Sequence, residues 1–529
     1  MFLIMSGDYI GQELRSEFGP IPPSFLPLGN RRLFQHQFRL IPEGETVVLS
    51  LPESFRVSRL DRIWLDRRGV QTVQVPDGLS LGASFVAAMN LVESPLDEPL
   101  RVLYGDTLID PLPEGDDLIV VSTVEDNYDW AVVTGDNEHW LDTSEELRQK
   151  RTQDVVSGYF SFARPRQLIR CITQCHWDFL EGVSRYHAEV GLELVRLSNW
   201  LDFGHVNTFF RSKARFTTQR AFNKMSISPR WVEKSSSHQQ KILAEAHWFE
   251  QIPPVMRQFT PQYLGRHKRG DSVSYRLEYL HHTALNELYV FAATPEVVWR
   301  QIFDACIGFL EECLEWEAPA NAFVAALDTL LVEKTQERLS EFCDKRGFSL
   351  SDKWHIGGRS EARSLGDLID QSEPWLPRGT GRPSLMHGDF CFSNILYDFR
   401  THRIKTFDPR GMTRDGRPSI YGDIYYDVAK LSHSVLGLYD WFIAGYFDVE
   451  MERNVITLDI AGAETHERTR ELFLDLIKQR FGLEPRALYA MQIHLFLSML
   501  PLHGDDLRRQ NGLMANAFRL SEIMEEDWA

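Results

Sequence analysis

The sequence predicts an α/β protein of two domains, for three reasons. A chain of 529 residues is long enough for about three domains or two large ones. Over about the first 150 residues, short β-branched runs alternate with helical patterns, which favours a mostly parallel sheet. Long helical patterns dominate from residue 295 onward. The pattern loosens at residues 223–229, so we expect domains at 1–225 and 226–529.

The overall charge narrows the classes of partner. With 57 Lys and Arg against 75 Asp and Glu, the formal net charge is −18. Such an acidic surface repels phosphate backbones and anionic lipid, so we expect no nucleic-acid partner. A local basic pocket for a small phosphate is compatible with this charge. The sequence does not indicate the oligomeric state.

Composition indicates a soluble protein in a reducing compartment. The chain is 43% apolar and 25% charged, as in ordinary globular proteins. No apolar run approaches the roughly 18 residues that cross a bilayer, so we expect no membrane insertion. Six cysteines are too few for a disulfide framework, and Cys171 and Cys175 suit one helix face. We therefore expect a cytoplasmic protein.

Individual elements follow from local patterning. In the first domain we expect strands and helices bounded by Gly, Pro and Asp. The strands are expected at 1–5, 46–51, 100–104, 117–124 and 155–162, and the helices at 84–92 and 167–186. In the second domain we expect strands at 231–234 and 272–279 and helices at 239–251 and 295–317. Residues 351–382, rich in Gly, Ser and Arg, are expected to form a surface loop.

The second domain contains a pattern suited to phosphoryl transfer. Asp389 follows an apolar run and precedes Asn394 by five residues, just ahead of another apolar run. A carboxylate there can accept the proton of an attacking hydroxyl, and an Asn amide oxygen can bind Mg²⁺. Asp408 ends the next apolar strand, fourteen residues after Asn394. Its carboxylate can hold a metal that bridges nucleotide phosphates.

A lysine and a glutamate complete this pattern. Lys234 lies in a strand-like run, and Glu245 lies eleven residues later in the expected helix 239–251. A strand lysine oriented by a helix glutamate is the arrangement that anchors the α- and β-phosphates of ATP in kinases.

Residues 226–529 resemble the aminoglycoside phosphotransferase and choline kinase family, the small-molecule branch of the protein-kinase-like fold. The resemblance implies a bilobal kinase domain that uses ATP and Mg²⁺. It implies that Asp389 is the catalytic base, that Asn394 and Asp408 bind magnesium, and that Lys234 and Glu245 anchor ATP. It also makes 421–430, with Asp423 and Asp427, a mainly structural segment. Only 226–229 can take the place of the family's glycine-rich turn, and it has no glycine.

The first domain carries a different pattern of carboxylates. Asp106 follows the apolar strand 100–104, and the carboxyl edge of a parallel sheet is where ligands bind. Asp202 precedes a helix, and two aspartates can share one Mg²⁺ and hold the α-phosphate of a nucleoside triphosphate. Gly82 opens the helix before residue 92, where backbone N–H groups can approach a base or phosphate.

Residues 1–225 resemble the sugar-phosphate nucleotidyltransferases. The resemblance implies a Rossmann-like domain in which Gly82 borders the nucleobase of a second nucleoside triphosphate (CTP, UTP or GTP) and Asp106 and Asp202 bind metal. The signature loop is altered: 6–15 keeps Gly7 and Gly11, and Arg15 can substitute for a missing arginine. Ser24 replaces a phosphate-binding lysine, and Lys150 matches a second lysine. We expect His205 to be a structural polar residue.

Together these patterns predict a bifunctional enzyme. It would phosphorylate a free sugar or small polar alcohol with MgATP and then transfer a nucleotidyl group to that phosphate. The product would be a nucleotide-activated precursor for surface polysaccharide such as capsule. A kinase with a non-catalytic N-terminal domain is the alternative, favoured by Ser24 and the altered loop. A pseudo-enzyme scaffold is a third, disfavoured by Asp389, Asn394 and Asp408. The acceptor and the nucleobase stay open.

Overall fold

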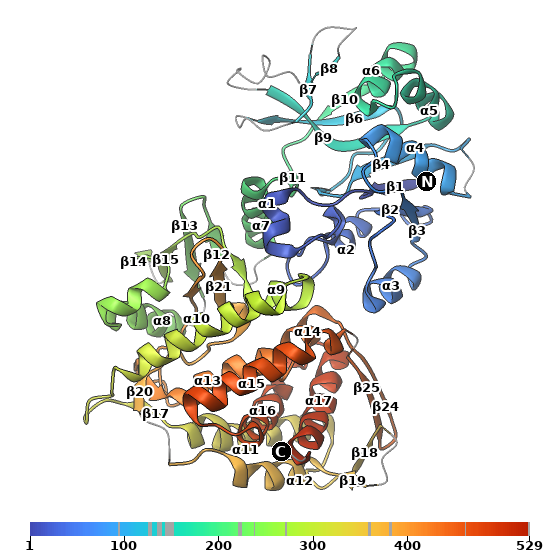
Figure 1. Cartoon of the computed structure of the whole chain (residues 1–529). Coiled ribbons are helices and arrows are strands. Elements are labelled where there is room, and N and C mark those ends of the chain that lie inside the picture. The colour runs from blue at the N-terminus through green and yellow to red at the C-terminus, as the bar shows by residue number, and fades with distance from the viewer. Residues whose placement is uncertain are drawn as a thin grey trace. The chain divides into compact units, whose positions relative to one another are not determined.

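The computed structural model describes residues 1–529 except 94–95, 125–129, 135–139, 143–152, 221–224, 237–238, 270–271, 358–360, 380–382, 461 and 527–529. The chain forms two compact units (Figure 1). The first comprises Met1–Thr217 with Phe291–Ala293, and the second comprises Thr218–Val290 with Thr294–Ala529. Among the described residues, no helix has the length and apolar character needed to span a membrane.

A mostly parallel sheet organises the first unit, as predicted. Its main path runs β10-β6-β9-β4-β1-β2-β3. Strand β1 pairs in parallel with β2 and β4, β2 with β3, and β6 with β10, whereas β9 runs antiparallel to β4 and β6. The strands are β1 (Phe2–Met5), β2 (Val47–Pro52), β3 (Gln71–Val75), β4 (Leu100–Tyr104), β6 (Leu118–Val124), β7 (Val132–Val133), β8 (Leu141–Asp142), β9 (Gln153–Phe162) and β10 (Glu193–Arg196).

The predicted strands are confirmed because their apolar runs are buried inside the unit. Strands β1 and β2 are buried along their whole length, as expected for parallel strands covered on both faces. The helices are α1 (Gln12–Phe18), α2 (Leu33–Phe38), α3 (Arg59–Asp66), α4 (Leu81–Leu91), α5 (Pro165–Gln174), α6 (Phe179–Val190) and α7 (Val206–Arg220). Side chains of α4, α5 and α6 share one apolar core with β1, β4 and β9.

The expected single helix 167–186 is wrong, because the chain forms α5 and α6 instead. Between them, His176 and Trp177 adopt positive φ angles of 53° and 67°. Asp178 then caps α6, accepting a hydrogen bond from the Glu181 backbone N–H at 2.9 Å. Asp is a preferred N-cap residue, so this break had a local signal. Cys171 is buried in α5 and Cys175 is its C-cap; both are free thiols.

The second unit begins with an antiparallel sheet and one helix. The strand order is β12-β13-β15-β14, from β12 (Met225–Ile227), β13 (Trp231–Ser235), β14 (Tyr263–Arg269) and β15 (Ser272–Glu278). Helix α8 (Gln239–Gln251) has the predicted bounds and packs against β13, β14 and β15. This is the smaller lobe of the bilobal, kinase-like fold.

A mostly helical lobe follows. Helix α16 packs against α11, α13 and α17 (Figure 1). The helices are α9 (Leu285–Phe291), α10 (Glu296–Leu314), α11 (Lys334–Arg346), α12 (Leu365–Ser372), α13 (Ile424–Val435), α14 (Tyr439–Ala444), α15 (Glu467–Phe481), α16 (Pro485–Met499) and α17 (Leu507–Glu525). The expected helix 295–317 is confirmed as α10, three residues shorter at its C-terminal end.

Short strands complete this lobe. They form the sheets β16-β21-β22, β17-β23-β20 and β19-β18-β25-β24. Their bounds are β16 (Thr283–Ala284), β17 (Val324–Ala325), β18 (Trp354–Ile356), β19 (Ala362–Arg363), β20 (Pro383–Leu385), β21 (Ile395–Asp398), β22 (Arg403–Thr406), β23 (Tyr421–Asp423), β24 (Asp448–Glu452) and β25 (Val455–Asp459).

The expectation that 351–382 is a surface loop is wrong. Its described residues include β18, β19 and α12. Strand β18 pairs with β25, a segment about a hundred residues away that no local pattern could reveal. Helix α12 begins with a capping box, in which Ser364 and Asp367 bond each other's backbone N–H. That motif was readable in the sequence.

Candidate active sites

The predicted base and its asparagine lie together at the end of β20. Asp389 has a side chain 42% exposed, whereas the flanking His387 and Phe390 are buried. Asn394 donates through Nδ2 to Asp389 Oδ2 at 3.0 Å and to the Asp389 carbonyl oxygen at 2.9 Å. Both of these bonds use the Asn394 amide nitrogen, so its amide oxygen is not engaged by Asp389.

Buried polar groups fix the backbone of this loop. Asp427 on α13 accepts hydrogen bonds from the backbone N–H groups of His387 at 2.6 Å and Gly388 at 2.7 Å. His387 Nδ1 accepts from the Asp389 backbone N–H at 3.2 Å, and its Nε2 lies 2.8 Å from Thr406 Oγ1. Burial lowers the pKa of His387 to about 4, so the ring is neutral. Asp427 therefore has the structural role that its segment implied.

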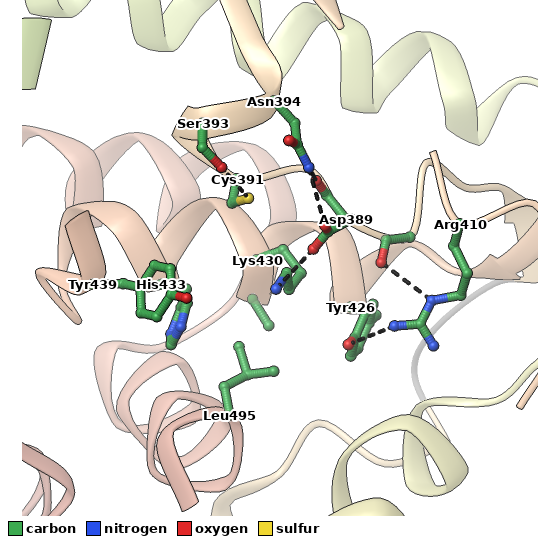
Figure 2. A network of polar contacts seen from close by, with 12 residues as sticks. Asp389, Cys391, Ser393, Asn394, Arg410, Tyr426, Lys430, His433, Tyr439 and Leu495 are labelled. Atoms are coloured by element: carbon green, nitrogen blue, oxygen red, sulfur yellow. Dashed lines mark hydrogen bonds and ion pairs between the residues drawn. The ribbon is translucent and has the colours of Figure 1, made fainter. Parts of the chain in front are cut away.

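A residue that sequence reasoning missed contacts the candidate base. Lys430 Nζ lies 2.8 Å from Asp389 Oδ1, and the lysine is almost completely buried on α13 (Figure 2). Burial alone would raise the pKa of Asp389, but Lys430, with Arg410, holds it well below its usual value. The carboxylate stays ionised. Helical spacing was the available signal, because Lys430 lies three residues after Asp427.

The structure also brings together the predicted ATP anchor and the second predicted metal ligand. Lys234 Nζ lies 2.8 Å from Glu245 Oε2 and 2.8 Å from Asp408 Oδ1. Tyr275 donates to the same Glu245 oxygen at 2.7 Å. Burial would lower the pKa of Lys234, but the two carboxylates raise it above its usual value. The lysine is therefore a fixed cation.

A close backbone approach holds the Asp408 loop against α8. Gly411 has a φ of +64°, and a Cβ there would lie 2.0 Å from the carbonyl oxygen of Ala244, the residue before Glu245. Only glycine permits this approach. Gly411 thus keeps the loop of Asp408 beside the helix that carries Glu245.

The turn between β12 and β13 contains a serine and no glycine. Ser228 Oγ accepts hydrogen bonds from the backbone N–H groups of Arg230 at 3.3 Å and Trp231 at 3.0 Å. The side chain closes this turn, so a tight connection forms without glycine.

In the first unit, the two predicted metal aspartates flank one glycine. A Cβ on Gly204 would lie 2.5 Å from Asp106 Oδ2 and 3.3 Å from Asp202 Oδ1. Strand β11 (Trp200–Asp202) pairs with β5 (Thr107–Ile109), which places Asp202 opposite Thr107. Burial, and then the charge of Asp202, raise the pKa of Asp106 to about 6. In the described chain, neither aspartate forms an ion pair with Lys or Arg.

The mutual repulsion of these carboxylates fits a cation-binding pair. His205 Nδ1 lies 3.1 Å from Asp202 Oδ2, so His205 contacts the pair rather than standing apart from it. The described residues include no cluster of three or more His, Cys, Asp or Glu side chains placed to hold a metal. A metal at either site would therefore take further ligands from nucleotide phosphates or water.

Of the three glycines predicted to contact a nucleotide, Gly82 and Gly7 have packing roles. A Cβ on Gly82 would lie 2.4 Å from the carbonyl oxygen of Trp177, so this glycine lets α4 approach the α5–α6 turn. A Cβ on Gly7 would lie 2.5 Å from Ser84 Oγ, which places Gly7 against α4. Gly11 is the N-cap of α1, with open space around it.

The predicted cations of this domain are not brought to the aspartates. Arg15 is exposed on α1, with its guanidinium 6.0 Å from the centre of the Tyr9 ring. Ser24, which replaces the expected lysine, is fully buried and donates to Ser6 Oγ at 2.8 Å. Lys150 lies outside the described residues. Transition-state stabilisation by these residues stays a prediction.

Comparisons with known proteins found similarities to solved structures alone. No family model and no curated protein matches the chain. Residues covering 42% of the chain match 97% of an inositol-1-phosphate CTP transferase from T. maritima, at 18% identity and a TM-score of 0.31. An aminoglycoside-3'-phosphotransferase of type VIII matches 55% of the chain over 85% of its own length (13% identity, TM-score 0.27).

A glucosamine kinase matches 56% of the chain over 74% of its own length, at 12% identity and a TM-score of 0.32. These structures are what the two parts of the chain resemble. Because the TM-scores lie below 0.5, we base the function on side-chain geometry.

We predict that Gly411→Ala disrupts the second unit and its active site together. The added methyl overlaps the backbone of α8 and strains a positive φ, which should lower the free energy of unfolding by about 3 kcal/mol. ADP formation should fall by about 100-fold because Glu245 and Asp408 move apart. Thermal unfolding and a coupled ADP assay measure both effects.

Gly347→Ala is the matched control. Gly347 has a φ of +67° at the end of α11, but a Cβ there would meet nothing within 4 Å. It should cost only about 1 kcal/mol and leave ADP formation unchanged. Equal effects of the two substitutions would contradict the role of the Gly411–Ala244 contact.

We predict a pH-dependent stabilisation by Asp106→Asn in metal-free buffer. The pKa of Asp106 is about 6 in the folded chain against 3.8 when exposed, so folding favours the protonated form. Stability is then lost as the pH rises through about 6. The substitution should raise the unfolding free energy at pH 8 by on the order of 2 kcal/mol, and leave it nearly unchanged at pH 4. Destabilisation at pH 8 would show that the two carboxylates do not repel each other.

Proposed function

We propose that this chain is a bifunctional transferase: a small-molecule kinase joined to a sugar-phosphate nucleotidyltransferase. The observation that supports this most strongly is a pair of polar groups within one unit, in which Lys234 contacts Glu245 and Asp408 and Asn394 contacts Asp389. The separate pair Asp106 and Asp202 supports the second activity. The domains would be 1–225 and 226–529.

In the kinase reaction, Asp389 would accept the proton of the acceptor hydroxyl as that oxygen attacks the γ-phosphorus of ATP. Lys234, oriented by Glu245, would bind the nucleotide phosphates. Asn394 and Asp408 would hold Mg²⁺, which neutralises phosphate charge when bound. Lys430 keeps Asp389 ionised and oriented. The acceptor is a free sugar or small polar alcohol.

In the first unit, Asp106 and Asp202 would hold Mg²⁺ beside a second nucleoside triphosphate, CTP, UTP or GTP. The phosphate made by the kinase would receive the nucleotidyl group, releasing pyrophosphate. Arg15 and Lys150 are the candidate cations for the α-phosphate. The product would be a nucleotide-activated precursor for surface polysaccharide, made in the cytoplasm.

A second candidate function is a kinase whose first unit binds a nucleotide without catalysing transfer. Ser24 favours this second function because it replaces the expected lysine. Its side chain is buried and carries no positive charge that could bind a phosphate. In the described chain, no Lys or Arg forms an ion pair with Asp106 or Asp202. Lost cations would remove several kcal/mol of transition-state stabilisation.

Two substitutions test the two activities separately. Asp389→Ala should lower ADP formation from MgATP and an acceptor by about 10²- to 10⁴-fold, because the hydroxyl loses its base. It should leave pyrophosphate release from a supplied sugar phosphate intact. Asp106→Ala should do the reverse. The exposed Asp344→Ala is the control for removing a carboxylate and should change neither rate.

Loss of both activities in each variant would contradict the assignment of two independent sites. ADP formation without any pyrophosphate release, across all nucleotides and sugar phosphates supplied, would select the second candidate function.

A further inference from the structure

Three cations gather around one buried phenol beside the candidate base. Arg410 Nη2 and Lys334 Nζ each lie 3.0 Å from Tyr426 Oη. Tyr426 lies on α13 four residues before Lys430, so both side chains lie on one face of that helix. Figure 2 shows Tyr426 and Arg410 beside the Asp389–Lys430 pair. We call Lys334, Arg410, Lys430 and Tyr426 the cation cluster.

Few carboxylates balance the positive charges of the cation cluster. In the described chain, Lys430 pairs with Asp389, but neither Lys334 nor Arg410 forms an ion pair. The acidic residues of the neighbouring helix have other partners: Glu333 and Glu337 pair with Arg414, and Glu341 pairs with Lys345. A local excess of positive charge is thus built into a chain with a net charge of −18.

Within this cluster, Lys334 is the cation whose charged form burial disfavours. Burial lowers the pKa of Lys334, and the charges of Arg410 and Lys430 lower it further. Burial alone would raise the pKa of Tyr426, but the three cations lower it to about 7. Like charges brought together out of water cost free energy unless an anion compensates them. The phenol supplies only part of that compensation.

The cluster lies on the acceptor side of Asp389. One carboxylate oxygen, Oδ2, accepts from Asn394, which with Asp408 and Lys234 marks the side of the nucleotide. The other oxygen, Oδ1, contacts Lys430, which leads to Tyr426 and on to Lys334 and Arg410. Lys334 and Arg410 each carry N–H donors beyond those bonded to Tyr426 Oη and the Gly388 carbonyl oxygen, and these could bind a group of the acceptor.

We propose that the kinase acceptor is an alcohol that already carries a fixed negative charge, a carboxylate or a phosphate, bound by Lys334 and Arg410. This inference rests on the proposed kinase function. The acceptor oxygen forms a bond to the γ-phosphorus of ATP, and the bond from that phosphorus to the bridging oxygen of ADP breaks. ADP leaves with the electron pair, and the hydroxyl proton passes to Asp389 and then to water.

Matched acceptors test the charge requirement on the full chain. ADP formation is measured with glycerol, glycerate and glycerol 3-phosphate, with glucose and glucuronate, and with glucosamine as the cationic case. The kcat/KM for the anionic member of each pair should exceed that of the neutral member by about 100-fold. Glycerate and glycerol 3-phosphate distinguish a carboxylate from a phosphate as the recognised group.

Variants then assign the preference to the cluster. Lys334→Met should reduce the ratio of anionic to neutral kcat/KM by about 10- to 100-fold, mainly through the KM of the acceptor. Lys334→Glu should shift the preference toward glucosamine. Lys345→Met, on the same helix but exposed and paired only with Glu341, should leave the ratio unchanged.

A preference for neutral or cationic acceptors would overturn the inference while leaving the kinase function standing. An equal loss with every acceptor in Lys334→Met would also overturn it, because that is the effect of a structural role. If no acceptor gives ADP, the proposed kinase function is wrong. Binding of glycerate, glycerol 3-phosphate and glycerol, measured by calorimetric titration, then tests the inference on its own. Anion binding that is lost in Lys334→Met would uphold it, and no anion binding would overturn it.

Discussion

The two oxygens of the Asp389 carboxylate organise the kinase site. One accepts from Asn394 and the other contacts Lys430, so the side chain is fixed and ionised. Around it, the buried Asp427 holds the loop in place. Each of its carboxylate oxygens accepts one backbone N–H hydrogen bond from the loop. Asn394 lies on one side of that carboxylate, and Lys430, followed by Tyr426, Lys334 and Arg410, lies on the other.

The two units use charge in opposite ways. Asp106 and Asp202 place negative charges together with no lysine or arginine in ion-pair contact in the described chain, so they attract a cation. The cluster around Tyr426 places positive charges together with too few carboxylates, so it attracts an anion. In each arrangement one charged group, Asp106 or Lys334, is disfavoured by burial, and a bound ligand of opposite charge would offset that cost.

Much of the fold could be predicted from the sequence, because apolar runs bounded by Gly, Pro and Asp identify strands such as β1, β2 and β4. The set from Lys234 to Asp408 could be predicted because its residues recur at fixed spacings within or just after apolar elements. Pairings between distant segments, such as β18 with β25, could not. Helical spacing places Lys430 on the face of Asp427, but the contacts of Lys430 with Asp389 and of Lys334 with Tyr426 join segments far apart in the chain and could not be predicted. Conversely, Gly82 suggested a nucleotide contact, and its close neighbour is the backbone of Trp177.

The central claim is that one chain both makes a phosphate ester and activates it, and the fate of a single phosphorus atom tests this claim most directly. The full chain would be incubated with ATP labelled at the γ-phosphate, CTP, UTP and GTP, Mg²⁺ and the acceptor that gives the most ADP. Our account predicts that the label moves first into a phosphate ester and then into a nucleotide-linked product, as unlabelled pyrophosphate is released. Label that stops at the ester, with every nucleotide present, would contradict it.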